Sequence, residues 1–468
     1  MGYNVAAFTY NENDQIASRK NNDGTLSLFA YNGAGDLVKQ TIYDKYGNPI
    51  DSFSYTYDTK GNITSITSKS GTTTYEYDEL DQLIKETAPD GTITEYTYDA
   101  AGNRTSKKVT RDGSTTTTTY TYDDVDQLTA VNGQAYTYDK NGNLTNDGSK
   151  TYAYDAENRL TRVQSGSDTV QFAYRADGMR TSMTTSTGTT YFHYDENKNV
   201  SFETNTSGQV VASYTFDGEN RPVSMTKDGQ TYYFQLNGQG DVIALTDANG
   251  NVVATYAYDA YGRITSHTGT FKSPYLYRGY RYDWETGLYY LQSRYYNPDM
   301  GRFLTRDTDS GEEMEPLTLN KYIYAVNNPV MNVDSDGNFY KTLKGYAKRV
   351  MRWLVNVIFR EFIMKPVTVA LSFFFPWLRT YRALRALRTP ILVKHTIIKL
   401  SRTSFGRRVW RSIKAGFIGV FYGGIGVSFV TAANRYLNPD RYFLRTRVGR
   451  IYVSRMTRLK NRVLRMIG

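Results

Sequence analysis

The pattern of apolar and polar positions changes once along the chain, close to residue 338. Through residues 1–275, aromatic and aliphatic residues alternate with polar ones, and short segments rich in Asp, Asn and Gly interrupt the alternation. A period of two predicts strands with one buried face, and the interrupting segments predict turns. No useful length of residues 1–275 has the three- to four-residue spacing of a helix, so we expect this part to be β throughout.

One repeat produces this pattern: Tyr-x-Tyr-Asp-x-x-Gly-Asn followed by an alternating run. The Asp can accept a hydrogen bond from the backbone two residues on, and the Gly supplies a positive φ, so each copy predicts a β-hairpin. We interpret these Tyr and Asp residues as scaffold, with an exposed sugar-binding row of tyrosines as the alternative. The clearer copies are at Tyr43-Asp44, Tyr57-Asp58, Tyr98-Asp99, Tyr138-Asp139 and Tyr258-Asp259, and degenerate ones are at Tyr77-Asp78, Tyr122-Asp123, Tyr154-Asp155, Tyr174-Arg175, Tyr194-Asp195 and Phe216-Asp217.

Charge divides the chain at the same place. Residues 1–338 carry 28 Lys and Arg against 44 Asp and Glu, a net −16, whereas residues 339–468 carry 28 against two, a net +26. Opposite charges of this size predict that the acidic part holds the basic part, or that each binds a different partner. The chain has no cysteine, which excludes disulfides and thiolate metal sites, and we predict no cofactor.

Residues 276–338 contain three further motifs: Asp283-x-Glu285-Thr-Gly-Leu-Tyr-Tyr, Arg294-Tyr-Tyr-Asn-Pro-Asp-Met-Gly-Arg-Phe-Leu and Asn327-Asn-Pro-Val. With the repeats, they resemble the YD-repeat proteins, which include bacterial Rhs and wall-associated proteins and animal teneurins. The resemblance covers residues 1–338. It implies a mainly β fold in which YD-repeat hairpins spiral into a partial β-shell, with the Rhs repeat-associated core as a plug. Because the repeats are few, we expect an open, curved sheet whose aromatic rings pack between neighbouring hairpins.

The resemblance also implies a site at the end of the core. Several family members cut their own chain there with an aspartyl-protease-like pair, which needs one carboxyl as acid and one as base. Ser335 stands where the family usually has proline, and Thr308 follows the first acid where proline is also usual. The alternative is a structural ion pair inside the plug. Carried over position by position, the residues are Arg294 as support, Asp307 as one acid, and Asp334 and Asp336 in the cleavage-proximal motif that ends at Gly337.

Residues 339–468 place apolar and basic residues at three- and four-residue spacing, which predicts a mostly helical, basic domain. Its single histidine, His395, stands in an apolar run, where a lone histidine is more often structural. The alternative is a metal-independent ribonuclease that uses His395 and whose basic stripes bind the RNA backbone. Residues 416–433 are 18 uncharged residues, short for a membrane span, and a buried glycine-rich hairpin explains them equally well. Small residues that would let helices approach closely in a membrane are Gly416, Gly419, Gly423 and Gly424.

These observations predict three domains: YD repeats in 1–275, the Rhs repeat-associated core in 276–338 and a variable effector in 339–468. The resemblance implies an Rhs-type polymorphic toxin for interbacterial competition, with the repeats as carrier and an effector that permeabilises membranes or cleaves nucleic acid. Its partners would be a cognate immunity protein, the target membrane or RNA, and its own effector held by the shell. The alternative is a non-toxic cell-surface adhesion protein. The start, Met1-Gly-Tyr-Asn, lacks a signal peptide, so we expect secretion or wall association as part of a longer protein.

Overall fold

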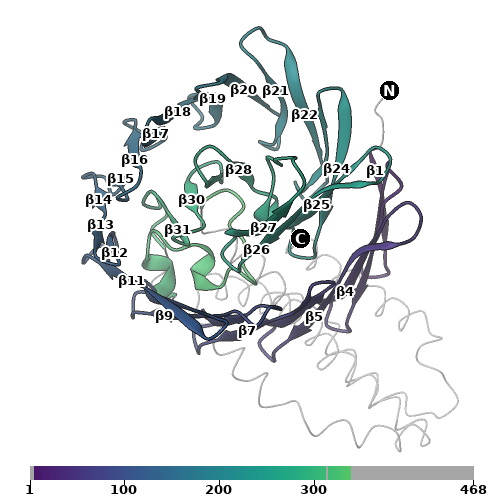
Figure 1. Ribbon diagram of the computed structural model, residues 1–468, viewed down its shortest axis with the longest axis horizontal. Coiled ribbons are helices and arrows are strands. Elements are labelled where there is room, and N and C mark those ends of the chain that lie inside the picture. The colour runs from purple at the N-terminus through teal and green to yellow at the C-terminus, as the bar shows by residue number, and fades with distance from the viewer. Residues whose placement is uncertain (1–4, 312–314, 339–468) are drawn as a thin grey trace, which may run out of the picture. The chain divides into compact units, whose positions relative to one another are not determined.

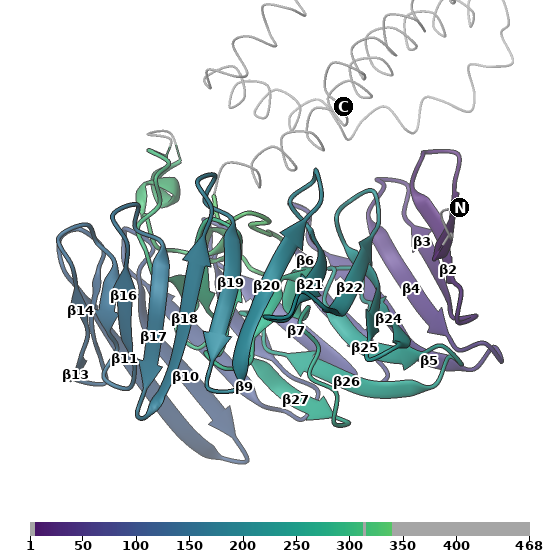
Figure 2. The ribbon, with the colours of Figure 1, turned by 90° about the horizontal axis from the view of Figure 1, so that it is seen from above.

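The computed structural model describes residues 5–311 and 315–338, all within one compact unit, Met1–Thr342. In this part of the chain, 27 strands follow one another as two consecutive antiparallel meanders. The meanders together bend into a ring, and the later segment that contains β28, β30 and β31 (residues 281–303) lies in its interior (Figure 1). The side view shows the strands lying side by side, with turns along both rims (Figure 2). The mainly β fold predicted from the alternation is therefore confirmed.

The strands form two sheets, which divide at Tyr136. The first contains β1 (Ala6–Tyr10), β2 (Ile16–Asn21), β3 (Leu26–Tyr31), β4 (Leu37–Tyr43), β5 (Pro49–Tyr57), β6 (Ile63–Ser68), β7 (Gly71–Tyr77), β8 (Leu83–Thr87), β9 (Ile93–Tyr98), β10 (Arg104–Arg111), β11 (Ser114–Tyr122), β12 (Leu128–Val131) and β13 (Gln134–Ala135). The second contains β14 (Thr137–Tyr138), β15 (Leu144–Asn146), β16 (Thr151–Tyr154), β17 (Leu160–Ser165), β18 (Asp168–Tyr174), β19 (Arg180–Thr185), β20 (Gly188–Tyr194), β21 (Val200–Thr204), β22 (Val210–Phe216), β23 (Pro222–Lys227), β24 (Gln230–Leu236), β25 (Val242–Asp247), β26 (Val252–Tyr258) and β27 (Ile264–Thr268).

The repeat turn has the geometry expected from its sequence. In the copy at Asp58, the carboxylate Oδ1 accepts hydrogen bonds from the backbone N–H of Lys60 at 2.8 Å and of Asn62 at 2.9 Å. Gly61 has φ +94°, the left-handed region that glycine enters without strain. The Asp residues were therefore correctly interpreted as turn scaffold.

The tyrosine before many of these turns has a role that the repeat pattern did not predict; Tyr138 is an exception, because its hydroxyl accepts the backbone N–H of Leu128. Where this role is present, the tyrosine hydroxyl donates to a backbone carbonyl near the end of a neighbouring strand, as Tyr77 does to Ile63 at 2.7 Å. Burial raises the pKa of such tyrosines well above the ordinary value, so the hydroxyl stays a donor. Each tyrosine that makes this bond thus joins one hairpin to its neighbour. Other such bonds join Tyr98 to Leu83, Tyr122 to Arg104, Tyr154 to Leu144, Tyr174 to Leu160, Tyr194 to Arg180 and Tyr258 to Val242.

Some degenerate copies have Asp or Asn in place of the turn glycine, and the side-chain oxygen of that residue binds the preceding copy. Asp81 stands at the glycine position with φ +63°, and its Oδ1 accepts a bond from the Asn62 amide of the preceding copy at 3.0 Å. A glycine there could not supply this oxygen. The same bridge joins Asn103 to Asp126, Asn143 to Asn158 and Asn199 to Asn220.

The curved sheet is not open, so that expectation was wrong. Its late strands β24 and β25 lie against β2 to β4 (Figure 1). Buried Arg19 donates to the carbonyl of Phe234 at 3.0 Å, and the Gln40 amide donates to the carbonyl of Leu236 at 2.7 Å. These side chains, rather than strand pairing, close the ring, because buried backbone carbonyls need donors.

The core fills the ring with a small sheet and three 3-10 helices. The sheet is β28 (Arg281–Asp283), β29 (Leu288–Tyr290), β30 (Tyr295–Asn297) and β31 (Arg302–Phe303), and the helices are η1 (Tyr277–Gly279), η2 (Pro316–Leu319) and η3 (Ala325–Asn327). Its tyrosines are among the most deeply buried side chains, which makes this segment a plug. Those least exposed are Tyr277, Tyr289, Tyr296, Tyr322 and Tyr324.

Polar side chains of the core dock on the repeat turns. Asn327 donates to the carbonyl of Gly102 and Asn328 donates to the Asn62 side chain at 3.2 Å. Arg302 donates to the Asn103 side chain at 3.0 Å. The core therefore binds one rim of the shell through the same turns that define the repeat.

One fully buried ion pair also fastens the core to the shell wall. Arg180 on β19 binds Asp283 on β28 through two nitrogens, at 2.5 and 3.0 Å, and neither side chain is more than 1% exposed. The Arg180 guanidinium lies over the rings of Phe192 and Tyr290, at 4.7 and 4.5 Å from their centroids. Removing one partner would leave a buried charge without compensation.

We therefore predict that Asp283→Asn destabilises the full chain strongly. Loss of one member of a buried ion pair costs about 3–5 kcal/mol, which should shift the urea unfolding midpoint clearly. The matched control is Glu76→Gln, which breaks the exposed cross-strand pair of Glu76 with Lys85 and should leave the midpoint unchanged. Equal midpoints for the two variants would contradict the role of the buried pair.

Candidate functional site

Three of the four residues carried over for the core junction have side chains that lie together. Arg294 is in the loop between β29 and β30, Asp307 follows β31, and Asp334 is near the end of the described chain. The Arg294 Nη2 atom is 2.7 Å from Asp307 Oδ2 and 3.6 Å from Asp334 Oδ2. All three side chains are no more than 6% exposed. One guanidinium therefore faces two carboxyl groups in a buried site.

Arg294 uses its other nitrogens on backbone carbonyls. Nη1 donates to Lys321 at 3.0 Å, and Nε donates to the carbonyl of Gly337. The guanidinium also lies over the ring of Phe303, 3.7 Å from its centroid. Burial lowers the pKa of Arg294, and the charges of Asp307 and Asp334 oppose that effect. Carboxylates, backbone carbonyls and an aromatic ring thus fix the position of the Arg294 cation, which polarises the Gly337 carbonyl.

Asp334 is the carboxyl of this pair that favours its proton. Burial raises its pKa to about 6, the Arg294 charge opposes this, and the nearby Asp336 and Asp307 charges add to it. Its Oδ1 atom is buried without a hydrogen-bond partner among the described residues. Its backbone N–H donates to the Tyr280 hydroxyl at 2.9 Å. Asp307 lies closer to Arg294, so its negative charge is directly compensated.

Sequence reasoning missed the residue beside Arg294. The Ser293 hydroxyl donates to the carbonyl of Asp336 at 2.6 Å, and its backbone N–H donates to the same oxygen at 3.2 Å. A single serine in a loop carries no recognisable pattern, so only its adjacency to Arg294 could have singled it out. Asp336, the fourth predicted site residue, thus contributes its backbone carbonyl to this contact.

This arrangement contains the parts that peptide hydrolysis needs. A protonated and an ionised carboxyl can act as acid and base, and a cation on a carbonyl oxygen can stabilise the negative charge that develops there. No group of three or more metal-binding side chains occurs among the residues that the structure describes. Asp307, Asp334 and Arg294 form a carboxyl pair with a cation.

The remaining predicted site residues lie outside the described ranges: His395, Gly416, Gly419, Gly423 and Gly424. Within the described ranges, no helix is long and apolar enough to cross a membrane. The membrane and nuclease interpretations of residues 339–468 both stay predictions.

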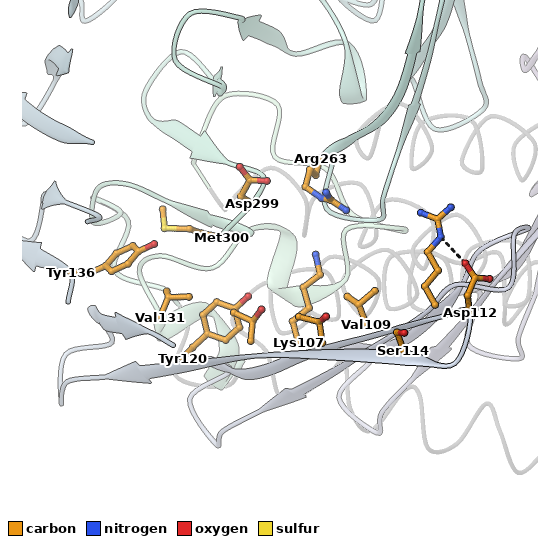
Figure 3. Close-up of a pocket in the computed structure, with 13 residues that line it drawn as sticks. Lys107, Val109, Asp112, Ser114, Tyr120, Val131, Tyr136, Arg263, Asp299 and Met300 are labelled. Atoms are coloured by element: carbon orange, nitrogen blue, oxygen red, sulfur yellow. Dashed lines mark ion pairs between the residues drawn. The ribbon is translucent and has the colours of Figure 1, made fainter. Parts of the chain in front are cut away.

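A cavity of about 710 Å³ lies elsewhere in the ring, between β10–β12 and the core (Figure 3). Its wall includes the cations Lys107, Arg111 and Arg263 and the acids Asp112 and Asp299. Lys107 and Arg263 both pair with the Asp259 carboxylate, at 3.5 and 3.3 Å. This part of the inner wall is not acidic, although residues 1–338 carry a net negative charge. Many of the acids stand instead in the turns, where they accept backbone N–H bonds.

Comparisons with known proteins agree with the repeat and core motifs. Residues 5–330 match the model of the teneurin YD-shell family. The chain is 42% identical over 366 residues to the tRNA nuclease WapA of Bacillus subtilis (strain 168), a match that covers 71% of this chain and 15% of that protein. It matches the tRNA3(Ser)-specific nuclease WapA of Bacillus spizizenii to the same extent. The chain therefore spans about 15% of the length of these curated relatives.

Solved structures show the same fold. The crystal structure of TcdB2-TccC3 superposes with a TM-score of 0.60 at 20% identity, over 71% of this chain and 20% of that chain. The TcdB2-TccC3-Cdc42 structure gives a TM-score of 0.60 over the same share of this chain. With the repeats, the core motifs and the family match over residues 5–330, this shows that the chain belongs to the teneurin YD-shell family, that is, to the Rhs and YD-repeat proteins.

Proposed function

We propose that this chain is part of an Rhs-type polymorphic toxin in which shell and core carry a basic effector and cut it free after Gly337. The observation that carries this proposal is the contact of Arg294 Nε with the Gly337 carbonyl, beside the two carboxyl groups of Asp307 and Asp334. The chain spans 15% of its WapA relatives, which supports a longer parent protein. That this parent is secreted or wall-associated is a proposal from the family.

In the proposed reaction, the ionised Asp307 carboxylate takes a proton from a water molecule, which attacks the carbonyl carbon of Gly337. Arg294 stabilises the negative charge on the carbonyl oxygen. Protonated Asp334 then donates its proton to the amide nitrogen of Asn338. The C–N bond breaks to give a Gly337 carboxylic acid and a free amine on Asn338. The proton of the new acid returns to Asp334 and the proton held by Asp307 passes to the amine, which leaves a Gly337 carboxylate, an Asn338 ammonium and both carboxyl groups restored.

We predict that purified protein splits between Gly337 and Asn338, and that Asp307→Asn leaves one full-length species. The amide cannot take the proton from water, and loss of a general base slows such reactions by about 10²–10⁴-fold. Intact-mass spectrometry separates the two outcomes. Asp309→Asn is the matched control: its side-chain oxygen accepts the backbone N–H of Gly311, and the Asp309 backbone N–H that donates to Asp307 Oδ1 at 2.8 Å is kept in the variant, so cleavage should be unchanged.

Cleavage should also depend on pH through Asp334. Because its pKa is about 6, the carboxyl is protonated and able to act as the acid below that pH. Above it, the protonated fraction and the cleavage rate should both fall by about tenfold per pH unit. A time course of cell-free synthesis followed at pH 5 to 8 gives this profile. A rate that rises from pH 6 to 8 would contradict the assignment of Asp334 as the acid.

For the effector, two activities are proposed. The printed names of the WapA relatives are tRNA nucleases, which supports a nuclease, and the net charge of +26 in residues 339–468 suits an RNA backbone. The uncharged residues 416–433 support membrane permeabilisation as the second candidate. Either activity would require a cognate immunity protein in the producing cell.

Expression of residues 339–468 in a bacterium without an immunity protein should stop growth. For the nuclease we expect degraded RNA, polarised membranes and rescue by His395→Ala. For the membrane activity we expect rapid loss of membrane potential, intact RNA and rescue by Val420→Asp, because a charge in mid-membrane costs about 2.5–3.5 kcal/mol. Unimpaired growth would remove both activities and favour the non-toxic adhesion protein.

A further inference from the structure

Two neighbouring donors hold two neighbouring carbonyls at the end of the core. Ser293 binds the carbonyl of Asp336 through its hydroxyl at 2.6 Å and its backbone N–H at 3.2 Å. Arg294 binds the next carbonyl, that of Gly337, through Nε. The residue pair 293–294 therefore holds both carbonyls that precede the proposed cut.

Close packing at Gly337 makes this double contact possible. Gly337 has φ +74°, which turns the chain in a way that side chains other than glycine rarely allow. A Cβ atom added here would lie 2.5 Å from Ser293 Oγ, 2.9 Å from the Leu291 carbonyl oxygen and 3.0 Å from Arg294 N. The backbone is thus pressed directly against the Ser293–Arg294 segment, and no side chain fits between them.

We infer that Ser293 is a positioning residue of the self-cleavage reaction. Its hydroxyl fixes the Asp336 carbonyl, and through the rigid peptide plane it fixes the Gly337 carbonyl on Arg294 and beside the carboxyl pair. A displacement of about 1 Å at a reacting group can cost about 10²-fold in rate. This inference rests on the proposed cleavage and extends it to a residue that touches neither the reacting carbonyl nor the acids.

The local structure suggests that loss of the hydroxyl leaves the fold intact. The Ser293 side chain is at the surface, and its backbone N–H still reaches Asp336 when the hydroxyl is removed. Arg294 keeps its bonds to Asp307 and Lys321 in any Ser293 variant. A change in cleavage can therefore be separated from a change in folding.

The experiment follows cleavage of the full chain during cell-free synthesis, with intact-mass readout over pH 5 to 8. We expect Ser293→Ala to cleave about 10- to 100-fold more slowly, with the rate falling at the same pH as in wild type. Ser293→Thr, which keeps the hydroxyl, should cleave within a few-fold of wild type. Ser207→Ala, which removes an exposed hydroxyl in a repeat turn outside the core, is the matched control and should not change the rate.

A second variant tests the same contact from the other side. Gly337→Ala places a methyl group against Ser293 Oγ and should also slow cleavage, even if Ser293→Ala fails to fold. Wild-type rates in Ser293→Ala, an equal loss in Ser293→Thr, or a shifted pH profile would each overturn the positioning role while leaving the proposed function intact. If wild type and Asp307→Asn both stay full-length, the proposed function itself is wrong.

Discussion

The typical repeat turn begins with an Asp whose carboxylate accepts hydrogen bonds from the turn backbone. The rest of this molecule depends on these bonds. In the copy at Asp58, one oxygen accepts two backbone N–H groups and fixes the turn without help from the rest of the fold. Because the same turn recurs along one rim, it offers polar groups at regular positions. Asn62 bridges to the next copy, and the core residue Asn328 binds Asn62 in turn. A local hydrogen-bond pattern thereby becomes the docking surface for the plug.

Buried arginines then join parts of the chain that are far apart in sequence. Arg19 closes the ring, Arg180 fastens the core to the wall, and Arg294 gathers the end of the core. Burial is expensive for a guanidinium, and it lowers the pKa of Arg19 to about 10. Such a group is tolerated only where carbonyls or carboxylates meet most of its donors. Each arginine therefore accepts one arrangement of its partners, which fixes how the distant segments meet.

The sequence predicted what is local and missed what is long-range. Alternation and turn residues gave the hairpins, and the Asp-to-backbone bond at Asp58 follows from side-chain chemistry alone. The closure of the ring by Arg19 and Gln40 was not predictable, because a repeat sequence does not indicate which distant backbone carbonyl its side chains will contact. Asp81 in place of glycine was visible in the sequence, but its purpose needed the partner Asn62.

The candidate site shows the same division. Arg294, Asp307 and Asp334 were selected through family resemblance and not through spacing, since 40 residues separate the first from the last. Their meeting depends on the whole core being folded, because Tyr280 binds the Asp334 backbone and Phe303 lies under the guanidinium. Folding of the plug and assembly of the carboxyl pair are therefore one event. In the proposed reaction the chain could not be cut before the core is complete, and afterwards the new Gly337 carboxylate would still face Arg294. The same contact that aligns the bond would keep the plug closed once the bond is broken.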